Sequence, residues 1–248
     1  MSLDFLSLDA AVQSDRFSPV SRSPMERQAR VAGGRFEIRE GWSLAVAYAS
    51  PEHEAETVRR GAGWADMSHL GKLELQAAPE DLEAIFSTNT GARFELGSAR
   101  RTTGTWWCPL APSRLLVVCE PSRLASVRGL LEDAISTSGM PASLVDVTTA
   151  FAALTVVGPS AREVFARFCA IDLRPHVTPV GGVCPGSVAR QPGIVICEGE
   201  QRFLMLFGWA VGEYMWRQVE EAGRRLGGAP VGVDSLASLD APLQEVRL

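Results

Sequence analysis

The sequence has 248 residues, 46% of them hydrophobic and 21% charged, a composition that excludes a disordered chain and a coiled coil. Its 24 basic and 29 acidic residues give a net charge of −5, without a basic block that would mark a nucleic-acid or anionic-membrane surface. The sequence contains neither a run of about 18 apolar residues, as a membrane span needs, nor a basic stretch before an apolar run at its start. The five cysteines and three histidines are dispersed, so we expect a reduced, cytoplasmic protein without a metal site.

Patterning is weak at the start of the chain and strong from residue 34 onward. Residues 1–33 are punctuated by Ser-Pro and Gly-Gly pairs, which predicts an irregular N-terminal arm. Helices are predicted to open at Pro51, Pro79, Pro121 and Pro159, because proline at the first helical position costs no hydrogen bond. The expected helices cover 51–61, 79–86, 121–136, 161–169 and 209–226, and the expected strands lie within 34–48 and at 72–77, 103–109, 114–119, 144–147, 154–157, 187–197 and 202–207.

An internal repeat divides the patterned region into two halves. Asp66-Met-Ser68 is matched 80 residues later by Asp146-Val-Thr148, and Ala78-Pro79 is matched at the same offset by Gly158-Pro159. Each half has the order strand, helix, two strands, helix, with a further strand to complete a split β-α-β topology. We therefore expect an α+β fold of two units, 34–147 and 148–248, with a central cleft between them as a ligand site.

The segment from Gly63 to Gly71 places a carboxylate, a hydroxyl and an imidazole in one loop, at Asp66, Ser68 and His69. Such a loop can present polar groups to a flat ligand; alternatively, Asp66 and Ser68 satisfy local backbone donors in a tight turn. A nucleophilic triad is disfavoured, because these residues are too close in sequence and no G-x-S-x-G elbow is present. An unrelated enzyme that uses His69 or Cys184 stays a third interpretation.

Three further residues are singled out by their position. Trp106 and Trp107 are adjacent in a predicted strand and must point to opposite faces, so one faces the core while the other either packs as well or stacks on an aromatic ligand in the cleft. Lys72 is the single lysine of the chain, directly after the Gly63–Gly71 loop, and we expect it to point to solvent. Phosphate-loop and Rossmann glycine patterns are absent.

Several motifs resemble one known superfamily. The run Arg59-Arg-Gly-Ala-Gly-Trp-Ala-Asp-Met-Ser-His-Leu-Gly71 is similar to the signature of the folate-binding aminomethyltransferases, which include the glycine cleavage T-protein, and Gly228-Ala-Pro-Val-Gly232 is similar to a turn near their last helix. Other segments are closer to the gamma subunit of heterotetrameric sarcosine oxidase, at 106–118, 145–148, 158–164 and 171–175. The resemblance covers about residues 34–235.

The resemblance implies two interlocked ferredoxin-like βαββαβ units around a central, folate-binding hole. It implies tetrahydrofolate as cofactor and either a flavoprotein or a lipoyl-protein as partner. The residues that it places at the folate are Asp66, Ser68, His69, Leu70, Trp106 and Glu198. Trp106 is preferred over its neighbour Trp107 as the tryptophan that stacks on the ligand.

The sequence also departs from the family pattern. The hairpin stretch 103–112 lacks the family's acidic residue, and the loop with the pterin-binding glutamate is replaced by 196–201, where Glu198 or Glu200 is a partial substitute. Val183-Cys-Pro-Gly186 does not reproduce the K-G-C-Y motif of a related branch, and we expect no C-terminal barrel of the kind that some members of the family have. We expect a tetrahydrofolate-binding, aminomethyltransferase-like protein of one-carbon metabolism with reduced or absent transferase activity, or a non-catalytic subunit of a sarcosine-oxidase-like flavoprotein complex; no catalytic residue is predicted.

Overall fold

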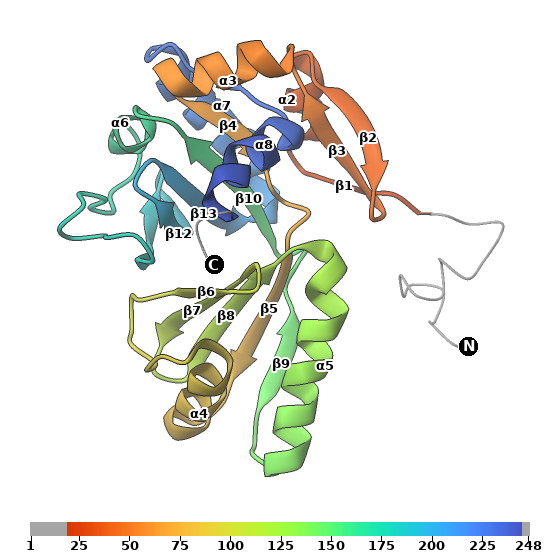
Figure 1. Ribbon diagram of the computed structural model, residues 1–248, viewed down its shortest axis with the longest axis vertical. Coiled ribbons are helices and arrows are strands. Elements are labelled where there is room, and N and C mark those ends of the chain that lie inside the picture. The colour runs from red at the N-terminus through yellow and green to blue at the C-terminus, as the bar shows by residue number, and fades with distance from the viewer. Residues whose placement is uncertain (1–18, 245–248) are drawn as a thin grey trace.

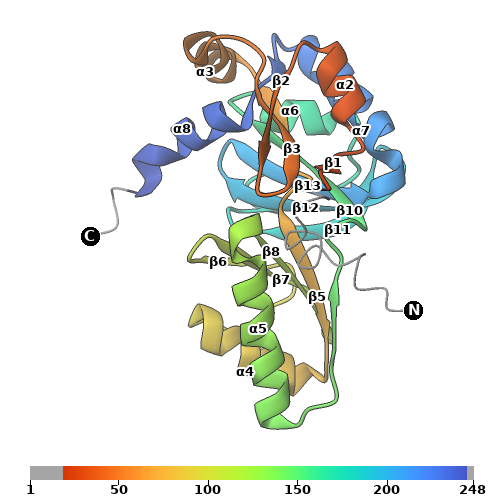
Figure 2. The same ribbon diagram turned by 90° about the vertical axis from the view of Figure 1, so that its right-hand side faces the viewer.

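The computed structural model describes residues 19–244, which form an α+β structure in two halves (Figures 1 and 2). One half contains a six-stranded sheet with the strand order β11-β12-β13-β10-β4-β14, and the other a five-stranded sheet with the order β6-β7-β8-β5-β9. The strands of the six-stranded sheet are β4 (Gly63–Asp66), β10 (Phe151–Val157), β11 (Val183–Val188), β12 (Gln191–Gly199), β13 (Arg202–Gly208) and β14 (Ala229–Pro230). Those of the five-stranded sheet are β5 (Gly71–Gln76), β6 (Arg100–Thr102), β7 (Thr105–Ala111), β8 (Arg114–Cys119) and β9 (Ser143–Asp146).

The other elements are a third, small sheet and the helices, most of which cover the outer faces of the two large sheets. The small sheet has the order β1-β3-β2 and consists of β1 (Ser21–Arg22), β2 (Arg35–Arg39) and β3 (Trp42–Ala47). The helices are α2 (Glu26–Val31), α3 (Pro51–Arg60), α4 (Pro79–Thr90), α5 (Pro121–Ser138), α6 (Ala161–Ala166), α7 (Gly212–Arg224) and α8 (Val233–Gln244), with a short 3-10 turn, η2 (Trp209–Val211). In the described part of the chain, no helix is long and apolar enough to cross a membrane.

Three of the four helix starts predicted from proline are confirmed, whereas the helix expected to open at Pro159 begins at Ala161. Helices α3, α4 and α5 each begin at their proline, and α3 is capped by Ser50, whose hydroxyl accepts a hydrogen bond from the His53 amide at 3.3 Å. Helices α4 and α5 end at Gly91 and Gly139, which take the left-handed conformation with φ of 67° and 65°.

Other expected elements differ from the observed ones. The single strand expected at 187–197 is a hairpin, because Ala189 and Arg190 form a tight turn with φ of 49° and 62°, a conformation that Asn-Gly normally signals. The helix expected at 161–169 ends at Ala166, and the first residues of the helix expected at 209–226 form η2 instead.

The N-terminal arm is ordered where the structure describes it. The first 18 residues of the predicted irregular arm lie outside the described residues, but β1 pairs in parallel with β3, and α2 follows it. Met25 and Ala29 are buried in the core that also contains Trp216 of α7, which explains why this short segment is helical rather than irregular.

Three apolar clusters hold the layers together. One lies between the six-stranded sheet and helices α6 and α7, one lies between the five-stranded sheet and helices α4 and α5, and the third lies between the two large sheets. The cluster between the sheets contains Trp106, Val118, Ile196 and Leu204. Each large sheet is therefore covered on both faces, which leaves few solvent-facing positions on its central strands.

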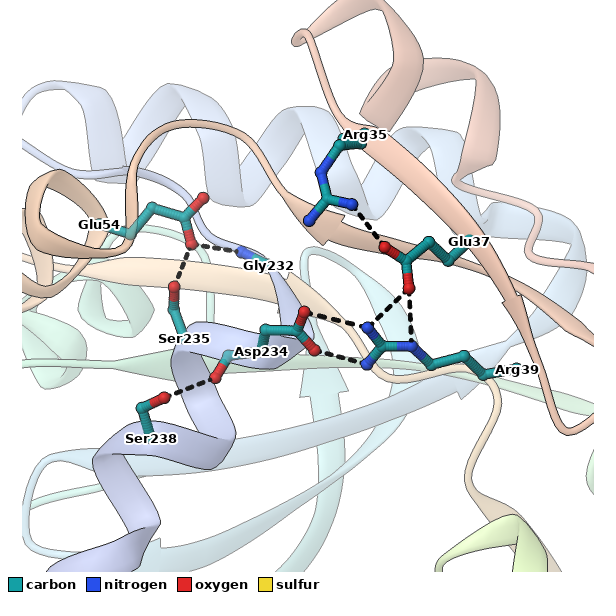
Figure 3. A network of polar contacts seen from close by, with 8 residues as sticks. All are labelled: Arg35, Glu37, Arg39, Glu54, Gly232, Asp234, Ser235 and Ser238. Atoms are coloured by element: carbon teal, nitrogen blue, oxygen red, sulfur yellow. Dashed lines mark hydrogen bonds and ion pairs between the residues drawn. The ribbon is translucent and has the colours of Figure 1, made fainter.

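Helix α8 is attached to the rest of the fold by a buried carboxylate, that of Glu54 on α3 (Figure 3). One oxygen accepts hydrogen bonds from the amides of Tyr48 and Ala49, and the other accepts from the Gly232 amide at 2.9 Å and from the Ser235 hydroxyl. All four donors satisfy one buried charge, which is the condition for burying a carboxylate without a large penalty.

Candidate functional site

The chain passes from one large sheet to the other twice, through the connections 67–70 and 147–150. The connection 67–70 joins β4 to β5, and 147–150 joins β9 to β10. Each is preceded by an aspartate, the last residue of a strand, whose side chain accepts a hydrogen bond from the backbone amide two residues on: Asp66 from Ser68 at 3.0 Å, and Asp146 from Thr148 at 2.9 Å. The matching motifs of the repeat therefore form matching turns, as expected for Asx turns.

Asp66 accepts a local hydrogen bond in this turn, whereas the hydroxyl of Ser68 binds a distant strand. Asp66 is half-buried, and burial raises the pKa of its carboxyl above the usual range against the opposing effect of its hydrogen bonds. The hydroxyl of Ser68 is fully buried and accepts from the Ala153 amide at 3.2 Å. The tight-turn interpretation therefore holds for Asp66, whose donor is local, but not for the hydroxyl of Ser68, whose donor lies 85 residues away; neither residue is a wall residue of the cavities described below.

Lys72 does not point to solvent, and the expectation that it would is wrong. Its side chain is 0% exposed, and its ammonium donates to the carbonyl oxygens of Ser68 at 2.9 Å, Leu70 at 2.8 Å and Thr148 at 3.4 Å. It therefore ties both connections together at the centre of the molecule. Burial lowers the pKa of Lys72 to about 7, although Asp66 and Asp146 oppose the shift.

Two neighbouring cavities lie beside the connection 67–70. The smaller has a volume of about 40 Å³, and Leu70, Trp106, Val118, Glu198 and Leu204 are among its wall residues. The larger has about 280 Å³, and its wall includes His69 together with residues of the small sheet and of α8. Both cavities share three wall residues, namely Met67, Glu120 and Arg202.

The smaller cavity is filled by a chain of polar contacts. Glu198 accepts a hydrogen bond from the indole N–H of Trp106 at 3.0 Å, and its other oxygen accepts from Nε of Arg202 at 3.0 Å. The side chains of Glu198 and Arg202 are only 9% and 19% exposed. Arg101 lies 5.7 Å from the ring of Trp106, where a cation–π contact adds to the closure.

His69 is buried at the wall of the larger cavity. Its Nδ1 atom has no hydrogen-bond partner among the described residues. Burial lowers the pKa of His69 to about 4, with a smaller contribution from the nearby Lys72 ammonium, so the imidazole is neutral at neutral pH.

The structure brings together some of the predicted site residues and separates others. Leu70, Trp106 and Glu198 meet at the smaller cavity, and His69 lies at the larger one. Trp107 points to the opposite face, as expected, and donates to Thr102 in the core under α4 and α5. Sequence reasoning missed Arg202, although it lies only four residues after Glu198.

The smaller cavity is too small for the folate that the resemblance implies. A volume of about 40 Å³ holds little more than one water, whose share of liquid volume is about 30 Å³, whereas sites for ligands of folate size have roughly 300–1,000 Å³. Both oxygens of Glu198 already have donors from the chain itself. At the smaller cavity, Leu70, Trp106 and Glu198 therefore do not fit tetrahydrofolate in the arrangement observed. Among the described residues, no group of three or more His, Cys, Asp or Glu side chains is placed to hold a metal ion.

Comparison with known proteins identifies relatives of this architecture, although no model of a known family matches the chain. The aminomethyltransferase of Saccharopolyspora erythraea is 25% identical over 86% of this chain, and the sarcosine oxidase subunit alpha of Rhizobium meliloti is 24% identical over 96% of it. These matches cover 60% and 27% of the two proteins, so the chain spans well under two thirds of either relative.

Solved structures give the same relationship at the level of the fold. A chain of heterotetrameric sarcosine oxidase from Corynebacterium sp. U-96 superposes with a TM-score of 0.62 at 22% identity, covering 86% of this chain and 99% of that one. Glycine cleavage system aminomethyltransferase T from Bartonella henselae superposes with a TM-score of 0.70 at 16% identity, covering 87% and 60%. In sequence and in fold, the chain is similar to aminomethyltransferases and to sarcosine oxidase subunits, which supports a relationship to the T-protein-like superfamily.

Proposed function

We propose that this chain is a non-catalytic subunit of a flavoprotein complex of the sarcosine oxidase type, and that it transfers no one-carbon unit on its own. The observation that supports the proposal most is that hydrogen bonds among Trp106, Glu198 and Arg202 close the smaller cavity. The hairpin strand β7 also has no carboxylate that could assist a transfer reaction. The 99% coverage of a sarcosine oxidase chain supports the same assignment.

We also propose that the fold consists of two interlocked ferredoxin-like units, 34–147 and 148–248, around this cavity. The order β9-β5-β8-β7 within the five-stranded sheet supports the first unit, because it is the 4-1-3-2 order of a βαββαβ chain. The interlocking is supported by β4, which precedes the first sheet in the chain but pairs with β10 in the second.

The complex is tested by purifying the tagged chain from its host. We expect a flavin-containing chain to co-purify in a fixed ratio, and the mixture to oxidise a secondary amine such as sarcosine. The isolated chain should transfer no one-carbon unit to tetrahydrofolate. A monomer without a flavoprotein partner, or transferase activity of the isolated chain, would contradict the proposal.

A second candidate is an aminomethyltransferase-like, tetrahydrofolate-binding protein of one-carbon metabolism, cytoplasmic and served by a lipoyl-protein donor. The larger cavity of about 280 Å³ favours it, because His69 at its wall has a buried Nδ1 without a partner among the described residues. Isothermal titration with tetrahydrofolate tests it, and saturable heat that is lost in His69→Gln supports it. Absence of heat at high ligand concentration speaks against it.

A further inference from the structure

A groove of about 390 Å³ lies at one end of the apolar layer between the two large sheets, and its described wall contains none of the residues that the sequence predicted for a site. The smaller cavity lies at the other end of this layer, beside Trp106 of β7 and Leu204 of β13. The groove lies four residues further along the same two strands, beside Leu110 and Gly208. Its apolar wall also includes Phe151, Ile194 and Val211.

The groove is open because Gly208 has no side chain. Gly208 is the last residue of β13 and lies on the same face as Leu204 and Leu206, which pack between the sheets. Its φ of −55° and ψ of 136° are accessible to any residue, so the backbone does not require glycine. A Cβ atom at Gly208 would have no heavy atom within 4 Å. The layer between the sheets therefore stops one side chain short, and the space left free belongs to the groove.

Arg114 is the one charged residue in the described wall of the groove. Its Nη2 atom donates to Glu74 at 2.6 Å, and Glu74 is not a wall residue. Its Nε atom is buried and has no hydrogen-bond partner among the described residues. A guanidinium has five N–H donors, so the ion pair with Glu74 leaves donors for a second acceptor. The other polar side chain of the described wall, that of Gln191, is a neutral amide.

We propose that this groove binds a small amphipathic carboxylate, such as a medium-chain fatty acid. The apolar wall buries the hydrocarbon part of the ligand, and the guanidinium of Arg114 binds its carboxylate. The groove has the features of a small-ligand site, because such sites have apolar walls, few polar groups and volumes of roughly 300–1,000 Å³. The inference does not depend on the proposed flavoprotein complex.

The test is isothermal titration of the isolated chain with octanoate, and with octan-1-ol as an uncharged ligand of equal chain length. We expect saturable binding of octanoate, and binding of octan-1-ol that is about tenfold or more weaker, because the alcohol lacks the charge that pairs with a guanidinium. In Arg114→Met this preference should disappear, since methionine keeps the wall apolar but has no charge. Arg128→Met is the matched control, because Arg128 on α5 is also paired with a glutamate, Glu132.

A second variant tests the groove without breaking an ion pair. Gly208→Leu places a side chain in the open space, so we expect it to abolish octanoate binding. Gly129→Leu is its control, because a Cβ atom at Gly129 on α5 also has no heavy atom within 4 Å, and Gly129 is not a wall residue of the groove. Thermal unfolding establishes which variants are folded. If Arg114→Met does not fold, Gly208→Leu alone decides the outcome.

Three results would overturn the inference. The first is the absence of saturable octanoate binding to the wild type. The second is unchanged binding in a folded Gly208→Leu, or an unchanged preference for octanoate in a folded Arg114→Met. The third is a flavoprotein that co-purifies with the wild type and is lost in Gly208→Leu, because the groove would then be covered by a partner chain. Failure of the wild type to co-purify with a flavoprotein contradicts only the proposed complex and leaves the titration result standing.

Discussion

The connections 67–70 and 147–150 have the same backbone chemistry and opposite environments. Both follow an aspartate whose side chain accepts a hydrogen bond from the amide two residues on. Both also contain a backbone hydrogen bond, from the Leu70 amide to the Met67 carbonyl at 3.1 Å and from the Ala150 amide to the Val147 carbonyl at 3.0 Å. Yet Ser68, His69 and Leu70 are buried, whereas residues 149–150 and Asp146 are exposed.

The difference arises from the residues that follow each turn. Lys72, after the first connection, is buried and binds carbonyl oxygens of both connections; the residue 80 positions later is Ala152, which is buried but has no polar side chain. Local sequence therefore determines the turn, while the long-range partners determine which turn lies at the centre. Of these two regions, only the buried one has side chains with strongly shifted pKa values, namely those of His69 and Lys72.

The largest expected effect concerns Lys72 at alkaline pH. Its pKa in the folded chain is about 7, below the ordinary 10.5, so the unfolded chain binds more protons between these values and stability rises with pH there. From pH 7 to 9 we expect a gain of about 2 kcal/mol in the free energy of unfolding. Urea denaturation of the wild type and Lys72→Met measures it; the rise should be present only in the wild type, and parallel curves would show that Lys72 is not the source.

The second effect concerns His69 at acid pH. Its folded pKa of about 4 lies below the ordinary 6.5, so the unfolded chain takes up a proton first and stability falls as the pH is lowered from 6.5. We expect a loss of about 2 kcal/mol by pH 4.5 in the wild type relative to His69→Gln. Carboxylates titrate equally in both chains and cancel in this difference. An identical acid dependence of the two proteins would refute the prediction.

The two aspartates give a direct comparison of the turns. In Asp66→Ala the buried Ser68 amide loses its acceptor, which costs about 2 kcal/mol. In Asp146→Ala the partly exposed Thr148 amide can turn to water, so we expect about 0.5 kcal/mol. Chemical denaturation of both variants checks the difference. Equal losses would mean that burial does not distinguish the two turns.

The smallest expected effect concerns the hydroxyls that bind across to the next strand. Ser68 accepts from the Ala153 amide at 3.2 Å, and Thr148 accepts from the Lys72 amide at 3.0 Å. Ser68→Ala leaves the Ala153 amide without its acceptor, whereas Thr148→Ser keeps the hydroxyl. The loss in the free energy of unfolding should therefore be about 1 kcal/mol larger for Ser68→Ala. Thermal unfolding midpoints of the two variants measure this, and the reverse order would contradict it.

Part of this arrangement was predictable from the sequence. The tight turn at Asp66 was one of two interpretations of its segment and could be foreseen because the Asx interaction is local, and the adjacent Trp106 and Trp107 had to face opposite sides of a strand. The burial of Lys72 was not predictable. Polar and apolar residues alternate along β5, and this pattern does not show that both faces of its sheet are covered. Arg202 and Trp106 are 96 residues apart in sequence and come together only because the two large sheets pack against each other. No local sequence pattern encodes that packing.

The carboxylate of Glu54 has a consequence for how the chain opens. The amides of Tyr48, Ala49 and Gly232 all donate hydrogen bonds to this one carboxylate. A single displacement of the Glu54 side chain therefore exposes three amides, from two segments distant in sequence, to hydrogen exchange at the same time. Their hydrogen–deuterium exchange should then be synchronous, with one common protection factor, and the start of α8 should detach in the same event that frees the end of β3. The N-terminal and C-terminal parts of the described chain thus form one cooperative unit at this point.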